Sequence, residues 1–224
     1  MNERVLVIVA HPDDEVLGCG GTIARHVASG DAVHICFLTD GVGARGDDVG
    51  AAARRNAAAR RAVAILGGSE LTFHAFPDNR LDRVDLLTVV KTIEDEIANV
   101  QPTTIYTHHA GDLNIDHVIC NRAVLTACRP LPGQAVRNIY AIEIASSTEW
   151  GSIGSSAPFT PTRYVDISKF IDLKRRALEA YAEEMRAFPH PRSYEALEAL
   201  AHWRGSTAGL AAAEAFMVLR EIER

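Results

Sequence analysis

A run of five apolar residues near the start of the chain, Val5 to Val9, constrains the fold more than any other feature. Four of the five are β-branched, and a short continuous run of this kind is typical of a buried strand. Strands and helices then alternate along the first two thirds of the chain. We expect strands over residues 4–10, 32–38, 70–76, 103–108 and 137–144, and helices over 15–29, 51–66, 83–99 and 116–128. This alternation predicts an α/β, Rossmann-like fold with a mostly parallel sheet and helices on both faces.

The last third of the chain has a different pattern. Residues 145–162 are rich in Ser, Thr, Gly and Pro, which indicates a loop. A short strand is expected over 163–167, followed by three helices over 169–187, 193–203 and 207–222. We therefore interpret residues 1–224 as a single domain whose residues 168–224 form a helical C-terminal extension.

Composition excludes several classes of protein. The net charge of −6 and the absence of a long basic run argue against a nucleic-acid surface. No apolar stretch approaches the roughly 18 residues of a membrane span, and the first strand begins too early for a signal peptide to precede it. The four cysteines form no CxxC pair, which favours buried thiols in a reducing compartment. A cytoplasmic protein acting on a small molecule is expected.

A polar cluster, His11-Pro12-Asp13-Asp14-Glu15, directly follows the first strand. Adjacent carboxylates and an imidazole are costly to bury unpaired, and ligands of open α/β sheets bind at the carboxyl ends of strands. A divalent metal would explain the cluster. His11 and one aspartate would ligate the ion, and the other aspartate would be free to move protons.

A third metal ligand is expected from another strand end. The segment from His108 to His117 follows the fourth strand, and His117 can ligate, whereas Asp116 can orient a neighbour through a hydrogen bond. Each half of the set is modest evidence alone, because a lone histidine is usually a surface or core residue. Their position after two different strands makes coincidence improbable.

The motif Ala10-His11-Pro12-Asp13-Asp14-Glu15 resembles the signature of the PIG-L or LmbE-like family of zinc-dependent N-deacetylases. These enzymes remove acetyl groups from N-acetylglucosamine units of glycolipids, thiol cofactors, chitin fragments and antibiotics. The resemblance runs nearly end to end. It includes Thr39-Asp40-Gly41, Pro77-Asp78-Asn79-Arg80-Leu81-Asp82, Gly111 to His117, and Pro189-His190-Pro191-Arg192-Ser193.

The resemblance implies one Zn²⁺ per chain, held by His11, Asp14 and His117, with Asp13 as the general base. Asp116 is expected to support a histidine. It also implies a small N-acetylated sugar as the substrate and a hydrolytic reaction that releases acetate.

Two departures from the family pattern bear on the remaining site residues. Many members carry a histidine where this chain has Asn114, so His190 is our candidate for stabilising the oxyanion, either within the chain or from a neighbouring subunit of a homo-oligomer. A glutamate that many relatives place near Arg54 is missing here. Arg54, Arg80 and Asn114 are therefore the candidates for binding substrate, and Trp150 could stack on a sugar ring.

Rival interpretations remain open. Gly18-Cys19-Gly20-Gly21 superficially resembles a phosphate-binding loop, but Ile23 stands where GxGxxG requires glycine. A non-catalytic metal-bound scaffold would not need Asp13 beside a ligand, and a two-metal phosphatase needs more carboxylates. An amide hydrolase acting on a non-sugar or antibiotic-biosynthesis intermediate is the nearest alternative. The loops at 39–50, 77–82 and 145–162 are expected to decide the substrate.

Overall fold

The structure, a computed structural model, describes residues 2–45, 50–151 and 158–223. Its centre is a seven-stranded sheet in the order β3-β2-β1-β4-β5-β7-β6. The strands are β1 (Arg4–Val9), β2 (Ala32–Thr39), β3 (Glu70–Phe76), β4 (Thr104–Thr107), β5 (Asn138–Ala141), β6 (Arg163–Asp166) and β7 (Ala213–Arg220). The first five pair in parallel, and β7 is antiparallel to both β5 and β6. The predicted α/β fold with a mostly parallel sheet is confirmed.

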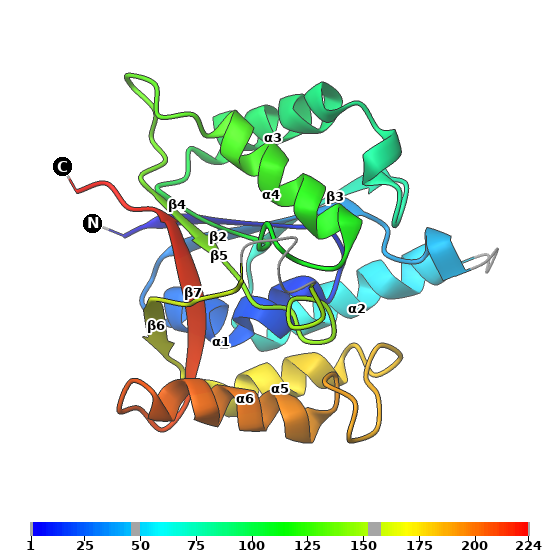
Figure 1. Cartoon of the computed structure of the whole chain (residues 1–224), viewed down its shortest axis with the longest axis vertical. Coiled ribbons are helices and arrows are strands. Elements are labelled where there is room, and N and C mark those ends of the chain that lie inside the picture. The colour runs from blue at the N-terminus through cyan, green and yellow to red at the C-terminus, as the bar shows by residue number, and fades with distance from the viewer. Residues whose placement is uncertain (1, 46–49, 152–157, 224) are drawn as a thin grey trace.

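Helices cover both faces of this sheet (Figure 1). One face carries α3 (Leu86–Val100) and α4 (Ile115–Ala127), and the other carries α1 (Asp14–Ala28) and α2 (Ala51–Ile65). Beyond α1 and α2, α5 (Ile171–Glu179) packs against these two helices, and α6 (Tyr194–Ser206) packs against β7. Two short 3₁₀ helices, Gly43–Arg45 and Leu81–Arg83, lie in the loops after β2 and β3. Among the described residues, no helix combines the length and apolarity needed to cross a membrane.

The alternation of side chains along β1 explains its continuous apolar run. Val5, Val7 and Val9 pack into the core on the side of α1 and α2. Leu6 and Ile8 pack into the second core, beneath α3 and α4. All five are fully buried, because a central parallel strand has no face left for solvent.

The expected helix over 207–222 is wrong, because residues 213–220 form β7. Its sequence, Ala-Glu-Ala-Phe-Met-Val-Leu-Arg, is rich in good helix formers, which misleads a reading from propensity. Tertiary pairing overrides that propensity, since β7 fills the space between β5 and β6. The C-terminal segment therefore contains helices α5 and α6, but it also completes the sheet.

The glycines of α1 serve close packing. A Cβ at Gly18 would lie 2.8 Å from Ile142, and one at Gly21 would lie 2.8 Å from Ile167. Only glycine lets the helix approach these side chains. The Gly18-Cys19-Gly20-Gly21 segment therefore has a packing role in the core, which explains its glycines without a bound phosphate. The helix breaks at Cys19, and the buried carboxylate of Glu214 accepts the Gly21 and Thr22 amide hydrogens that the break leaves without helical partners.

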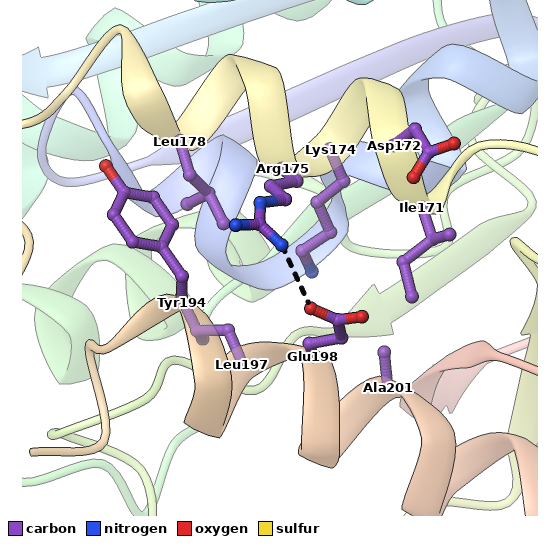
Figure 2. Close-up of a pocket in the computed structure, with 9 residues that line it drawn as sticks. All are labelled: Ile171, Asp172, Lys174, Arg175, Leu178, Tyr194, Leu197, Glu198 and Ala201. Carbon is purple, nitrogen blue, oxygen red and sulfur yellow. Dashed lines mark hydrogen bonds and ion pairs between the residues drawn. The ribbon is translucent and has the colours of Figure 1, made fainter. Parts of the chain in front are cut away.

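Helices α5 and α6 pack side by side, as Figure 2 shows. Arg175 and Glu198 face each other across a small cavity of about 40 Å³, with a guanidinium-to-carboxylate distance of 3.4 Å. The side chains that line this cavity all come from the two helices, so it is a feature of their packing.

The strand order also explains where a site forms. β1 pairs with β2 on one side and with β4 on the other, so the connections after β1 and β4 leave the sheet in opposite directions. Such a switch point opens a crevice at the carboxyl ends of the two strands. The segments beginning at Ala10 and His108 start at this crevice.

Candidate metal centre and active site

Three buried ligand atoms converge at the ends of β1 and β4. The Oδ2 atom of Asp14 lies 3.1 Å from Nδ1 of His11 and 3.3 Å from Nε2 of His117, and the two ring nitrogens are 3.3 Å apart. The structure therefore brings together the three residues that the sequence proposed as ligands. Two imidazole nitrogens and a carboxylate are a donor set that Zn²⁺ commonly uses.

In each histidine, the ring nitrogen that points away from Asp14 contacts one or two other carboxylates. Nε2 of His11 lies 3.2 Å from Oδ2 of Asp116 and 3.2 Å from Oδ1 of Asp78. Nδ1 of His117 lies 3.1 Å from Oδ1 of Asp112. Partners of this kind fix the orientation of a metal-binding imidazole and direct its other nitrogen at the ion.

Asp78 and Asp116 form a second candidate metal-binding group with His11, but their carboxylate oxygens already accept hydrogen bonds. Asp116 accepts amide hydrogens from Asn79 and Leu81, and Asp78 accepts the Ala44 amide hydrogen and an Asn79 side-chain hydrogen. By contrast, Oδ1 of Asp14 is buried and has no hydrogen-bond partner among the described residues. A buried carboxylate oxygen of this kind fits a cation, so the His11, Asp14 and His117 set is the better metal site.

The charges of the site also fit a cation. Burial opposes the charged form of His117, but Asp14 and Asp112 outweigh it and raise the pKa of His117 to about 9. Burial likewise disfavours ionised Asp14, yet the histidines around it hold the pKa of Asp14 well below its usual range. In the metal-free protein, a proton on the histidines thus neutralises charge that an ion would otherwise neutralise.

The neighbouring His108 has a different role. Its Nε2 accepts the Ala10 amide hydrogen at 2.8 Å, and its ring stacks on that of His117 at 3.8 Å. Burial, with the nearby charge of His117, lowers the pKa of His108 to about 3. His108 is therefore neutral and packs against the His117 ring.

Asp13 lies beside the candidate metal ligands in an unusual backbone conformation. Its φ angle is 138°, a value that a residue with a side chain rarely adopts, and backbone strain of this kind is concentrated at functional sites. The side chain is buried, and Oδ2 accepts hydrogen bonds from Arg55 at 3.2 Å and from Arg192 at 3.0 Å. Burial raises the pKa of Asp13, against the opposing charges of Arg192 and Arg55.

The backbone at Asp13 is supported by a second buried carboxyl group. Oε2 of Glu15 accepts the Asp13 amide hydrogen, and Oε1 accepts the hydroxyl of Tyr181 at 2.6 Å. Burial raises the pKa of Glu15 to about 8, against the Tyr181 hydrogen bond. Glu15 thus links the strained turn to the segment after α5.

The loop after β2 encloses the same turn. A Cβ at Gly41, whose φ is +66°, would lie 3.3 Å from Cβ of His11 and 3.2 Å from Cδ of Pro12. The Gly41 carbonyl accepts a hydrogen bond from Arg55, which also contacts Glu184 at 2.6 Å. Thr39-Asp40-Gly41 is therefore a close-packed wall of the site.

The sequence analysis proposed Arg54 as a substrate-binding residue. In the structure it is the neighbouring Arg55 that contacts Asp13. Arg55 is buried, and Arg54 is exposed. Both line a groove of about 560 Å³ between α2 and the segment that follows α5. Arg55 lies on the buried face of α2 with Ala59, Ala62 and Val63. Because the helix is rich in alanine on every side, the sequence does not show which face is buried.

The other predicted site residues lie in the loops around the cluster. Arg80 is exposed at the start of the Leu81–Arg83 helix. Asn114 caps α4 by accepting the Asp116 amide hydrogen, and its amide donates to Asn79. Neither placement tests whether these residues bind substrate.

The contacts of His190 are with its own loop and with Trp150. Its Nδ1 accepts the Arg192 amide hydrogen at 3.0 Å, and its ring packs edge-on against Trp150 at 5.8 Å. The conspicuous Pro-His-Pro motif thus brings Arg192 to Asp13, a contact that sequence reasoning missed although it quoted the segment. Asp78 and Asp112 were likewise inside quoted motifs, without an assigned role.

These observations define an α/β protein with a buried candidate centre for a divalent metal, beside a strained carboxylate. The profile of the family described as GlcNAc-PI de-N-acetylase, PIG-L, matches residues 6–128, more than half of the chain. The chain belongs to this family.

Curated relatives carry deacetylase names. The chain is 33% identical to the uncharacterized deacetylase YaiS of Escherichia coli strain K12 over 133 residues, which cover 57% of this chain and 69% of the relative. It is 28% identical over 201 residues to a probable N-acetyl-alpha-D-glucosaminyl L-malate deacetylase 2 of Bacillus cereus, covering 84% of this chain and 86% of the relative. Both relatives are therefore named as deacetylases.

The fold also supports other chemistry. The chain matches the crystal structure of GalB, the 4-carboxy-2-hydroxymuconate hydratase of Pseudomonas putida KT2440, with a TM-score of 0.79 and 24% identity, covering 100% of this chain and 99% of that one. This similarity shows a shared fold. The reaction must therefore be argued from the site residues.

Proposed function

We propose that this protein is a divalent-metal-dependent N-deacetylase that hydrolyses the acetamide of an N-acetylglucosamine-type sugar or sugar conjugate and releases acetate. The observation that carries the proposal is the convergence of His11, Asp14 and His117 beside the buried carboxylate of Asp13. The deacetylase relatives support the reaction type. The four free, buried cysteines suit a reducing compartment such as the cytoplasm.

The metal would be held by Nδ1 of His11, Nε2 of His117 and the Asp14 carboxylate, whose Oδ1 lacks a partner among the described residues. When bound, a divalent ion supplies Lewis acidity, which polarises an acetyl carbonyl and makes a water molecule more acidic. We assign Zn²⁺ from the nitrogen and oxygen donor set.

Asp13 is the proposed general base. Its raised pKa brings the carboxylate closer to the range in which it can take a proton from the attacking water and return it to the departing amine nitrogen. Arg192 and Arg55 both donate to its Oδ2, so they orient the carboxylate and favour its ionised form. Asp116 orients His11 and does not touch the substrate in this scheme.

His190 is proposed to help stabilise the oxyanion. An amide hydrogen of Arg192 can only donate, so Nδ1 of His190 is the acceptor and neutral His190 carries its proton on Nε2. That nitrogen is then a hydrogen-bond donor. Trp150 lies against the same ring and is half exposed, which suits stacking on a pyranose face.

Substrate binding is proposed for Arg54, Arg80 and Asn114. Arg54 lines the groove that also exposes part of Arg55, so a substrate in that groove would extend towards the Asp13 carboxylate. Parts of two loops expected to select the substrate, residues 46–49 and 152–157, lie outside the described residues.

The test is an acetate-release screen. Protein stripped of metal is incubated with N-acetylglucosamine, N-acetylated glycosides and simple acetamides, with and without added Zn²⁺. We expect Zn²⁺-dependent acetate release with a preference for the sugar conjugates, and none from the His117→Ala variant. Release only from simple acetamides would move the substrate to the non-sugar class. No release from any compound by metal-loaded protein would contradict deacetylation.

A further inference from the structure

A second group of metal-ligating side chains lies away from the active site. Cys36 of β2, His74 of β3 and Glu96 of α3 each place one ligand atom within 4.8 Å of the other two. The three residues come from elements that are adjacent in the fold, because β3 is the edge strand, β2 is its neighbour, and Cys36 packs in the core beneath α3.

We propose that Cys36, His74 and Glu96 bind a second metal ion, of the Zn²⁺ and Co²⁺ class, which fastens the edge of the sheet to α3. This site is separate from the one formed by His11, Asp14 and His117. The expected stoichiometry therefore rises from one ion per chain to two.

The donor set carries the proposal. One thiol, one imidazole and one carboxylate are the mixture of sulfur, nitrogen and oxygen ligands that Zn²⁺ and related late transition ions accept, whereas Mg²⁺ and Ca²⁺ prefer oxygen alone. Nε2 of His34 lies 3.6 Å from Oε2 of Glu96, but it is already paired with the Thr72 hydroxyl at 2.7 Å. The three side chains would therefore leave one position of a tetrahedral ion for water.

The burial of Glu96 supports a cation at this place. Glu96 is only 7% exposed, and its two oxygens face imidazole nitrogens, with Oε1 3.0 Å from Nε2 of His74. A buried carboxylate is costly unless it is paired, and an imidazole N–H group or a metal ion can supply that pairing. Cys36 lies against the same group without being able to provide a positive charge.

The site is open enough for an ion to enter. The side chains of His74 and His34 are 26% and 15% exposed, with His74 on the edge strand β3 and His34 on its neighbour β2. The thiol is completely buried beneath them. An ion can thus reach the two imidazoles from solvent before it contacts the sulfur.

Cobalt provides a selective probe, because the ligands assigned to the active site include no sulfur. Metal-stripped protein is titrated with Co²⁺ while the near-ultraviolet absorption from thiolate-to-cobalt charge transfer is recorded. We expect the band in the wild-type chain and in His117→Ala, and its loss in Cys36→Ser and His74→Ala. Cys128→Ser, which changes another buried cysteine of the same core cluster, is the matched control and should keep the band.

Zinc stoichiometry gives the second readout. Native mass spectrometry after Zn²⁺ loading should find two ions in the wild type, one in His74→Ala and one in His117→Ala. Because His74 is partly exposed, its alanine variant should fold, which circular dichroism checks. The result that would overturn the proposal is a single zinc ion per wild-type chain together with no charge-transfer band. The cluster would then be a hydrogen-bonded network of two histidines around Glu96.

Discussion

Nη1 of Arg192 lies 3.0 Å from Oδ2 of Asp13, although 179 residues separate them in the sequence. The guanidinium is held in place by Ser146, whose Oγ accepts from Nε at 2.8 Å. Arg55 reaches the same Asp13 oxygen from α2. Two arginines that are distant in sequence thus position the proposed base. Because each lowers the pKa of Asp13, removing either one should raise that pKa.

Arg192→Ala should move the pH dependence of the reaction. Removing the arginine removes a charge that lowers the pKa of Asp13, so that pKa rises and the acidic limb of the kcat/KM profile shifts to higher pH. Arg192→Lys keeps a positive charge and should shift the limb less. The profiles are measured with equal metal content in each variant. An acidic limb that is unchanged in Arg192→Ala would show that Arg192 does not act through Asp13.

Asp13→Asn and Asp14→Asn form a matched pair of isosteric changes at adjacent positions. Asp13→Asn should keep the metal and lose about 10²–10⁴ in kcat, the usual contribution of general acid–base catalysis. Asp14→Asn should lose the metal itself. Elemental analysis of the purified variants distinguishes the two outcomes. Loss of metal from Asp13→Asn with retention in Asp14→Asn would mean that the two roles are reversed.

His190→Ala should lower kcat by about 10²–10³ with metal content and KM little changed, because one oxyanion donor is removed. Trp150→Ala tests the alternative that the His190 ring serves only to pack against Trp150. If packing were its only role, the two variants would lower kcat to the same extent. An unchanged kcat in His190→Ala would leave Zn²⁺ and Asn114 as the remaining candidates for stabilising the oxyanion.

The metal-free protein should lose stability between about pH 6.5 and pH 9. Folding raises the pKa of His117 to about 9, so its stabilising contribution is fully present below the unfolded value near 6.5 and is lost as pH rises through 9. Over the same range, Zn²⁺ affinity should increase about tenfold per pH unit for each proton displaced. Urea unfolding with chelator at pH 6.5, 8 and 9 measures the first effect. His117→Gln, which lacks the titrating group, should show a smaller fall.

The sequence was sufficient to predict that the central candidate residues lie together, because they are close to strand ends. His11, Asp13 and Asp14 follow a strand of clear pattern, and His117 follows the strand that pairs beside it. Parallel pairing brings the carboxyl ends of these two strands to the same edge of the sheet. The proposed division of ligand from base came from the family motif, because spacing alone did not distinguish Asp13 from Asp14.

Other features depended on tertiary contacts that local pattern does not encode. Arg54 and Arg55 are adjacent in an alanine-rich helix, where nothing but the packed structure shows which one turns inward. Arg192 reaches Asp13 because the segment after α5 folds back over the site. Residues 213–220 carry helical propensity but pair as β7, because β5 and β6 present unpaired edges on either side.

The most direct measurement asks whether His11, Asp14 and His117 share one metal ion. Crystals of the protein are soaked in Zn²⁺, and an anomalous difference map is recorded at the zinc absorption edge. We predict a peak in contact with Nδ1 of His11, Nε2 of His117 and the Asp14 carboxylate, with Asp13 beside it and not among the ligands. A fully active crystal that shows no peak at these three residues, with the histidines still paired directly to Asp14, would contradict the proposed metal centre.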